Sequence, residues 1–315
     1  MKIDIIGTES LGVRGLSVVV KLNNRKIFID PGIALGYLRK GLSPHPVQVG
    51  VGKIIKERII NELKDTTDIV FSHFHGDHIP FLEANLYQLS IDEMKVIKND
   101  CNIWMDLQSE LSIKMGKRRN DLISEFKNNI IDFKENKNSF FTFSNPVPHG
   151  ENDTRFGTVT MTKIIQEEFV FVHASDIQFL SVETIEKIIE YKPNLVLASG
   201  PPIYLESFEK NKLDSALKNI IKLSNEVDTL IIDHHFLRNE EGVEYLKKLS
   251  KESKNEIICA ADYMKMNRHL LEAKRTELYE EIPVEENFQE LYFNNIIDVK
   301  KYMINAQEKY KWFQY

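Results

Sequence analysis

The chain has 315 residues, of which 42% are hydrophobic and 28% charged, a balance typical of a globular protein with a sizeable buried core. Its 41 Lys and Arg against 47 Asp and Glu give a formal net charge of −6, which disfavours a protein that coats nucleic acid through overall charge. No apolar run approaches the roughly 20 residues that a membrane-spanning helix needs. The two cysteines, Cys101 and Cys259, make no disulfide framework, so the cytoplasm is the expected compartment.

The first part of the chain is rich in predicted strands. Apolar residues that either alternate with polar ones or follow one another directly predict strands over 3–6, 17–22 and 26–29. The third strand ends in Asp30-Pro31-Gly32, where a turn holds a carboxylate at the strand terminus. A Gly- and Pro-rich stretch follows as far as Gly52, and isoleucines at helical spacing then predict a helix over 53–63.

The densest group of metal-competent residues follows the next apolar run, 68–72, and reads His73-Phe74-His75-Gly76-Asp77-His78. Imidazole and carboxylate suit zinc and neighbouring divalent metals. In an extended segment His73 and His75 project to one side. Beyond Gly76 the chain can turn and bring Asp77 and His78 to an adjacent position, so one loop can hold two metals. The alternative interpretation is a His-rich surface loop.

The segment 103–133 has few strand signals and is predicted to be a helical insertion between two strand-rich halves. It carries a basic cluster, Lys114, Lys117, Arg118 and Arg119. Two interpretations stay open for this cluster. It is a solvated helix end, which the absence of clustered aromatic residues favours, or it contacts phosphate.

Strands and helices alternate in the second half. Strands are predicted over 139–143, 158–162, 168–173, 195–198, 229–232 and 256–260, and helices over 182–191, 207–223 and 241–250. The tail from 268 onward is predicted to be helical, with a break at Pro283. Because no interdomain linker separates these segments, we expect a single mixed α/β domain over 1–315 with a helical C-terminal extension.

Several of the predicted strands lead into a metal-competent residue. His149 follows one strand in a proline-fixed turn, and another leads into His173-Ala174-Ser175-Asp176. A third leads into Asp233-His234-His235. Ligands at strand ends are favourable because a rigid sheet positions the loops that carry them.

In this order of motifs the chain resembles the metallo-β-lactamase superfamily: Asp30, His73-x-His75-x-Asp77-His78, His149, Asp176 and a late His. The resemblance spans residues 1 to about 260. It is similar in particular to an archaeal branch of predicted metal-dependent hydrolases, through the segments 9–14, 29–32, 44–46, 199–202 and 259–263. The fold that the resemblance implies is an αββα sandwich, two sheets flanked by helices, with the metals at one edge between the sheets.

The resemblance also implies a ligand set for two divalent ions, zinc in the first instance and manganese or iron as alternatives. The first metal is expected on His73, His75 and His149, the second on Asp77, His78 and a late His, and Asp176 bridges both. Strand alternation allows one of His234 and His235 to face the site. His234 is favoured, with Asp233 or His235 in the outer shell. Asp30 matches a position that orients ligands rather than binding metal.

The expected function is a dinuclear metal-dependent hydrolase. Two such ions lower the pKa of a bound water, so that metal-bound hydroxide is available at neutral pH, and Asp77 would both ligate and orient this nucleophile. A small-molecule or nucleic-acid substrate containing a phosphodiester or other phosphate is preferred, and a carbon ester, thioester or lactam is the alternative. A non-catalytic module that binds nucleic acid or a partner is the third possibility.

Three further residues are candidates for substrate contact. Arg14 lies between two glycines near the early hairpin and suits an anionic substrate. His45, between two prolines, is either a preset substrate contact or an exposed loop residue. His173 is either a substrate or outer-shell contact beside Asp176 or a partly buried strand-end residue.

Overall fold

The computed structural model describes residues 1–151 and 157–315 and contains two six-stranded sheets. The first sheet has the order β1(Lys2–Gly7), β2(Ser17–Leu22), β3(Arg25–Ile29), β4(Asp68–Phe71), β5(Asn102–Met105) and β6(Ile130–Asp132). The second has the order β14(Glu256–Ile258), β13(Thr229–Ile232), β12(Leu195–Ala198), β11(Phe169–His173), β10(Thr162–Gln166) and β7(Phe141–Phe143). A short pair, β8(Val147–Pro148) and β9(Thr158–Val159), lies apart from them.

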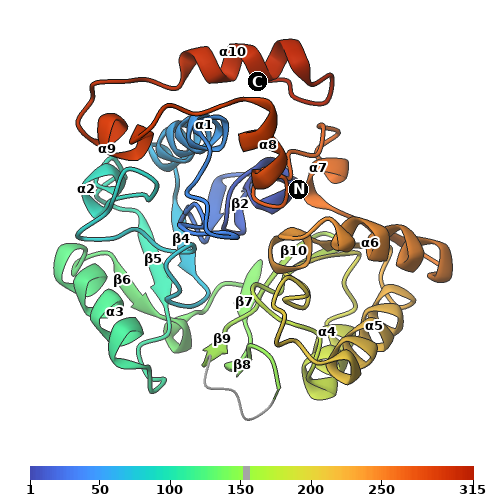
Figure 1. The fold of residues 1–315 in the computed structure, drawn as a ribbon. Coiled ribbons are helices and arrows are strands. Elements are labelled where there is room, and N and C mark those ends of the chain that lie inside the picture. The colour runs from blue at the N-terminus through green and yellow to red at the C-terminus, as the bar shows by residue number, and fades with distance from the viewer. Residues whose placement is uncertain (152–156) are drawn as a thin grey trace.

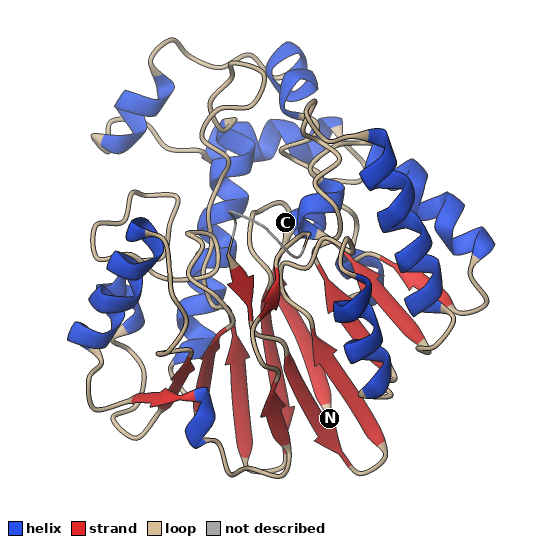
Figure 2. Ribbon diagram, turned by 90° about the horizontal axis from the view of Figure 1, so that it is seen from below, coloured by secondary structure: helices blue, strands red, loops and turns tan. Residues whose placement is uncertain are grey.

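Helices cover the sheets from outside. Figure 1 shows α1(Pro46–Leu63), α2(Ile91–Met94) and α3(Ile113–Glu125) beside the first sheet, and α4(Val182–Glu190), α5(Lys210–Ser224) and α6(Glu241–Glu252) beside the second. Figure 2 shows the strands of the two sheets running side by side with helices to either side. This is the αββα sandwich that the resemblance implies, and the predicted fold class is confirmed.

Each sheet combines antiparallel and parallel pairing. The strands β3 to β6 are parallel to one another, as are β11 to β14. The central parallel strands read as short apolar runs that are buried throughout, such as Leu195–Ala198 in β12. Such runs are typical of strands covered on both faces. Because the carboxyl ends of parallel strands meet at one edge of a sheet, the loops that follow them lie together.

The helical insertion expected over 103–133 is only partly helical. Its centre is α3, but its ends belong to β5 and β6, which extend the first sheet. These strands have four and three residues, too few for an alternating pattern to emerge from the sequence. The prediction of an insertion between two strand-rich halves is therefore wrong, because the segment completes the first of them.

The helix α1 begins at Pro46 rather than at Lys53, and so includes two glycines that the sequence suggested were part of a loop. A Cβ on Gly50 would lie 2.5 Å from Sδ of Met303, and one on Gly52 would lie 3.3 Å from the Leu35 side chain. The missing side chains thus let the C-terminal segment pack directly on this helix at Gly50 and the Leu35 side chain pack on it at Gly52. Because close packing outweighs intrinsic helix propensity, the helix tolerates both glycines.

The C-terminal segment lies over α1 as a series of short helices. These are α7(Ala260–Tyr263), α8(Arg275–Glu281), α9(Phe288–Phe293) and α10(Lys300–Lys309), and α10 crosses above α1 in Figure 1. The hydroxyl of Tyr315 donates to the carbonyl of Leu11, 2.7 Å away, so the last residue of the chain contacts the first loop. No helix in the described part of the chain is long and apolar enough to span a membrane.

Candidate metal centre

The loop His73–His78 leaves β4 at its carboxyl end and turns back on itself. The rings of His73 and His75 lie 4.6 Å apart, and the ring of His78 lies 4.3 Å from that of His73. A Cβ on Gly76 would lie 2.6 Å from the ring of Phe81, so a residue without a side chain is needed where the loop folds. The turn expected at Gly76 is therefore present, and it gathers the imidazoles of this loop.

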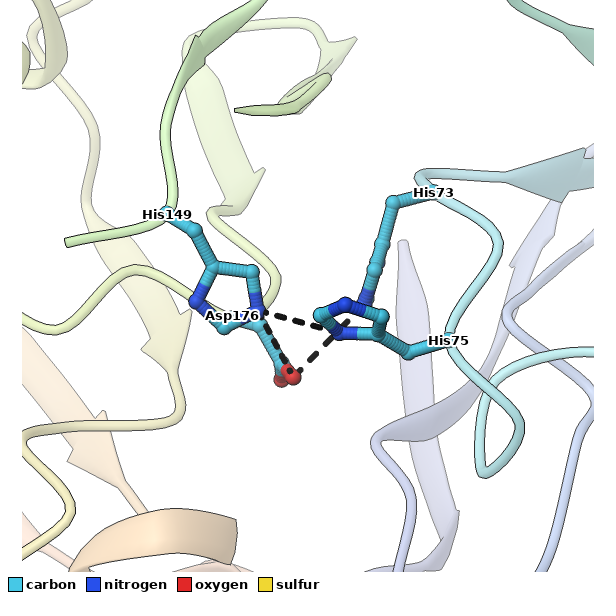
Figure 3. A group of neighbouring side chains, drawn as sticks. All are labelled: His73, His75, His149 and Asp176. Atoms are coloured by element: carbon cyan, nitrogen blue, oxygen red, sulfur yellow. Dashed lines mark hydrogen bonds and ion pairs between the residues drawn. The ribbon is translucent and has the colours of Figure 1, made fainter. Parts of the chain in front are cut away.

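A first group of candidate ligand atoms joins this loop to the second half of the molecule. The group comes from His73, His75, His149 and Asp176. These atoms all lie within 4.8 Å of one another. Figure 3 shows the two halves contributing from opposite sides, with His73 and His75 facing His149 and Asp176. Nε2 of His149 lies 3.2 Å from Nδ1 of His75 and 3.4 Å from Oδ2 of Asp176.

A second group of ligand atoms comes from Asp77, His78 and His234. Nε2 of His234 lies 3.3 Å from Oδ2 of Asp77, and Nε2 of His78 lies 4.0 Å from Oδ1. Asp176 lies between the two groups, because its carboxylate is 3.2 Å from Nε2 of His78 and 3.7 Å from Nε2 of His234. The geometry therefore brings together two sets of donors around one shared carboxylate.

Both late histidines face this carboxylate, contrary to the expectation that only one would. Nε2 of His235 lies 3.5 Å from Oδ2 of Asp176, and the two rings stack at 4.5 Å. Alternation fails here because the pair lies in the 3₁₀ helix η3(His234–Leu237) rather than in a strand. His234 has the left-handed φ of +50°, and the side chain of Asp233 accepts a hydrogen bond from its backbone N–H at 2.7 Å.

Asp30 anchors the loop His73–His78, which we call the metal loop. This residue is fully buried, and its Oδ1 accepts a hydrogen bond from the Ser72 amide at 2.8 Å. Its Oδ2 lies 2.9 Å from Nδ1 of His78. Because Nδ1 is thereby engaged, Nε2 of His78 is presented to Asp176 and Asp77. Asp30 thus contacts the ring of a candidate ligand residue and does not face the space between the candidate ligands. The resemblance implies this position for Asp30.

Electrostatics favour a charged carboxylate among neutral rings. Burial opposes ionisation of Asp176, yet the surrounding imidazoles, His78 first, hold its pKa well below the usual range. Burial is the main cause that lowers the pKa of His73 far below normal and that of His75 to about 4. The exception is His78, whose pKa Asp176 and then Asp30 raise well above the usual value against the effect of burial.

The residues present fit divalent metals. Among the described residues, neither oxygen of Asp176 accepts a well-formed hydrogen bond, and Nε2 of His73 and His78 also lacks a partner. An unpaired buried carboxylate costs free energy unless a cation satisfies it. Imidazole and carboxylate donors without a thiolate suit zinc, manganese or iron, whereas soft ions prefer sulfur ligands.

Two residues outside the motifs contribute to the site and were not predicted. Arg238 is buried, and its Nη2 donates to Oδ2 of Asp77 at 3.1 Å and lies 2.8 Å from Nε2 of His234. Gln178 places its side-chain amide 3.3 Å from Nδ1 of His149. Arg238 is the C-terminal cap of the short 3₁₀ helix η3, so its place beside His234 depends on a turn that the sequence does not predict.

Arg14 does not present a free cation. Its Nε donates to Oε2 of Glu272 at 2.7 Å, and a second hydrogen bond joins Nη2 to Oε1 of the same carboxylate. The expected contact between Arg14 and an anionic substrate is therefore replaced by an ion pair with the C-terminal segment.

His45 and His173 are structural residues. His45 is fully buried as the N-cap of α1, where its Nδ1 accepts from the Val47 amide and its Nε2 lies 2.9 Å from the carbonyl of Ile282. His173 is equally buried, and its Nε2 lies 3.0 Å from the carbonyl of Leu16. Because these rings face backbone groups in the interior, the predicted substrate contacts of both residues are corrected to packing roles.

Most residues of the basic cluster on α3 bind other groups of the protein. Arg118 donates to the carbonyl of Phe74 in the metal loop at 3.0 Å, and its guanidinium lies over the ring of Phe81. Arg119 donates to the carbonyl of Ser109 at 3.1 Å, and Lys117 pairs with Asp121. Because both arginines are engaged and Lys117 has an acidic partner, these three residues no longer support a phosphate-containing substrate.

No family model matches this chain. Over 304 residues it is 41% identical to a UPF0282 protein of Methanosarcina mazei, covering 96% of this chain and all of the relative. It is 34% identical to a UPF0282 protein of Pyrococcus furiosus, covering 89% of this chain and 92% of the relative. A third UPF0282 protein, from Methanocaldococcus jannaschii, is 33% identical over 91% of this chain and all of the relative.

Solved structures resemble this one more distantly. Unliganded yeast PDE1 has a TM-score of 0.48 and 14% identity, over 82% of this chain and 96% of that one. A metal-dependent hydrolase of the β-lactamase superfamily has a TM-score of 0.46 and 14% identity over the same shares of the two chains. At this level of similarity, neither structure bears on what this chain does.

Proposed function

The chain belongs to the UPF0282 family, and we propose that it is a metal-dependent hydrolase with a two-metal centre. The observation that supports this most directly is the environment of Asp176. Its carboxylate is buried, accepts no well-formed hydrogen bond from the described residues, and has five imidazole Nε2 atoms within 3.2 to 3.7 Å, those of His73, His78, His149, His234 and His235. A buried carboxylate that lies among imidazole nitrogens and accepts no well-formed hydrogen bond is suited to bind cations together with them.

We assign the ligands as two sets that share this carboxylate. His73, His75 and His149 would hold the first ion, and Asp77, His78 and His234 would hold the second. Zinc is the first choice, with manganese or iron as alternatives. Bound there, two divalent cations would lower the pKa of a water and polarise the oxygen of a scissile ester.

The remaining residues position these ligands. Asp30 keeps the ring of His78 in the tautomer whose Nε2 can ligate, and the side-chain amide of Gln178 holds the ring of His149 through its Nδ1. Arg238 donates to one oxygen of Asp77, which leaves the other oxygen to face the site. Burial of these contacts excludes water and restricts the motion of each ligand.

We propose that the bond hydrolysed is an ester bond. A phosphodiester is supported by the mixed carboxylate and imidazole donors, but no longer by the basic cluster on α3. A carbon ester is supported by the apolar wall of the cavity beside the imidazoles. We also propose the cytoplasm as the working compartment, because Cys101 and Cys259 are both buried and unpaired.

The proposal is tested by loading the protein with zinc or manganese and measuring hydrolysis of an activated phosphodiester and of activated carboxylic esters. Asp77→Asn should remove activity towards whichever substrate is hydrolysed, because the neutral amide is a poor metal ligand. Asp92→Asn, at an exposed acid on α2, is the matched control and should retain activity. Two bound metals without hydrolysis of any of these substrates would contradict the proposal.

A further inference from the structure

A cavity of about 380 Å³ opens beside the metal residues and borders the rings of His75, His149 and His235. Its size is that of a small-molecule site, which spans about 300–1,000 Å³ in proteins. The wall beyond the imidazoles is mainly apolar and includes Leu180, Pro202, Tyr204, Leu205 and Phe208. A molecule that enters the cavity therefore meets the candidate ligands at one end and a mainly apolar wall beyond them, which also includes Glu151, Gln178, Ser207, Glu209 and Lys212.

One cation and two carboxylates are among the described residues that line this cavity. Lys212 is the one Lys or Arg among the described residues that line it. Its Nζ lies 2.9 Å from Oε2 of Glu151 and 3.8 Å from Oε1 of Glu209. A polynucleotide is held chiefly by cations that neutralise its phosphates, and this wall offers no surplus of them. The cavity is therefore better suited to an uncharged group.

The apolar wall is held in place and is accessible. The ring of Tyr204 contacts two guanidinium groups, and its centre lies 5.1 Å from that of Arg39 and 5.3 Å from that of Arg238. Arg238 also donates to its hydroxyl at 3.1 Å. The next residue, Leu205, is 40% exposed and lines the cavity. Covering it with hydrocarbon would be favourable.

We infer that this cavity receives a compact apolar group of the substrate, such as a short acyl chain, while the carboxylic ester that carries the chain lies against the imidazoles. The inference rests on the proposed function and adds the class of substrate. In the reaction the oxygen of water adds to the ester carbon and the bond from that carbon to the leaving oxygen breaks. The proton passes to the leaving oxygen, so ester and water give an acid and an alcohol.

The kinetic test uses the zinc-loaded protein and the 4-nitrophenyl esters of acetate, butyrate and hexanoate. We expect kcat/KM to rise by about tenfold or more from acetate to hexanoate, because each buried methylene adds to transition-state binding. In Leu205→Ser the ratio of hexanoate to acetate should fall several-fold. Leu86→Ser, at a leucine that lines a different surface and is 46% exposed, should leave the ratio unchanged.

A binding measurement separates this inference from the proposed function. Calorimetric titration of the zinc-loaded protein with sodium acetate and sodium hexanoate should show tighter binding of hexanoate, and Leu205→Ser should reduce the difference. This result without hydrolysis of either the carboxylic esters or the activated phosphodiester would support the cavity assignment and contradict the hydrolase. Hydrolysis with no dependence on chain length, equal binding of the two acids, or preferred cleavage of a single-stranded oligonucleotide would overturn the inference and leave the hydrolase standing.

Discussion

Oδ2 of Asp30 lies 2.9 Å from Nδ1 of His78, and this contact determines which ring nitrogen of His78 faces the shared carboxylate of Asp176. A carboxylate at this point selects the tautomer that carries its proton on Nδ1 and a lone pair on Nε2. The residue directly after the first hairpin thus prepares a metal ligand from a loop that follows much later in the chain.

Replacing this carboxylate should weaken metal binding without removing any ligand. In Asp30→Asn the side-chain amide can donate to Nδ1 of His78 and so favours a proton on Nε2, where it blocks coordination. We expect metal affinity to fall by about 10–100-fold, the usual effect of losing such a partner. Competition with a chromogenic chelator measures the change. Asp262→Asn, which loses an ion pair with Arg268 instead, should bind metal as the natural protein does.

Gly32 should be intolerant of a side chain. A Cβ there would lie 2.2 Å from both the carbonyl carbon of His78 and the amide nitrogen of Ile79, so the backbone of the metal loop would have to move. We expect Gly32→Ala to lower the free energy of unfolding by about 3 kcal/mol and to reduce bound metal. In Gly116→Ala nothing lies within 4 Å of the new methyl group on α3. That variant should gain about 0.5–1 kcal/mol in urea unfolding, and equal effects of the two changes would contradict the prediction.

Arg118 should act on the metal loop rather than on substrate affinity. Loss of its hydrogen bond to the Phe74 carbonyl frees the loop. We therefore expect Arg118→Ala to lower kcat and metal content and to leave KM and its salt dependence unchanged. Lys117→Ala removes a neighbouring exposed cation and is the matched control, with no change in either constant. A KM that rises in both variants would restore the basic cluster as a substrate site.

The stability of the protein should fall in mild acid because His45 is buried as a neutral ring. Burial lowers its pKa to about 4, below the usual value of 6.5, so the unfolded chain binds more protons between these two pH values. The contribution is fully present above pH 6.5 and is lost as the pH falls towards 4, by up to about 3 kcal/mol.

His45→Asn keeps a residue that caps helices well but cannot titrate. Urea unfolding in the presence of a chelator, at several pH values between 4.5 and 7.5, should give a pH dependence that is shallower by about one proton than in the natural protein. Identical slopes in the two proteins would show that His45 is not the buried neutral ring that its contacts indicate.

The metal motif could be predicted because its information is local. His73, His75, Asp77 and His78 lie within six positions after an apolar strand, and His149 and Asp176 also follow strands. A rigid sheet brings such strand ends together whatever the details of packing. The same reasoning accounts for the fold class, since alternating strands and helices in the second half permit few arrangements.

The prediction that only one of the two late histidines faces the site was wrong for a reason that the sequence does not display. The direction of His234 depends on its left-handed φ, and this conformation is stabilised through Asp233. Oδ1 of Asp233 also accepts from the hydroxyl of Thr8 and the amide of Ser10, each at 2.9 Å. These partners come from the other end of the chain, so no local pattern reveals them. Arg238 was missed for the same reason, because its orientation follows that of the turn before it.

The distance along the chain between partners has a consequence for how the protein is made. A nascent chain on the ribosome presents His73, His75 and His78 long before Asp176 and His234 are synthesised. Glu272, the partner of Arg14, is synthesised later still, 258 positions after it. Because the two donor sets share Asp176, the first half alone cannot form the complete centre, and pairing over such separations is slow. The two donor sets can therefore be completed only after most of the chain has been synthesised.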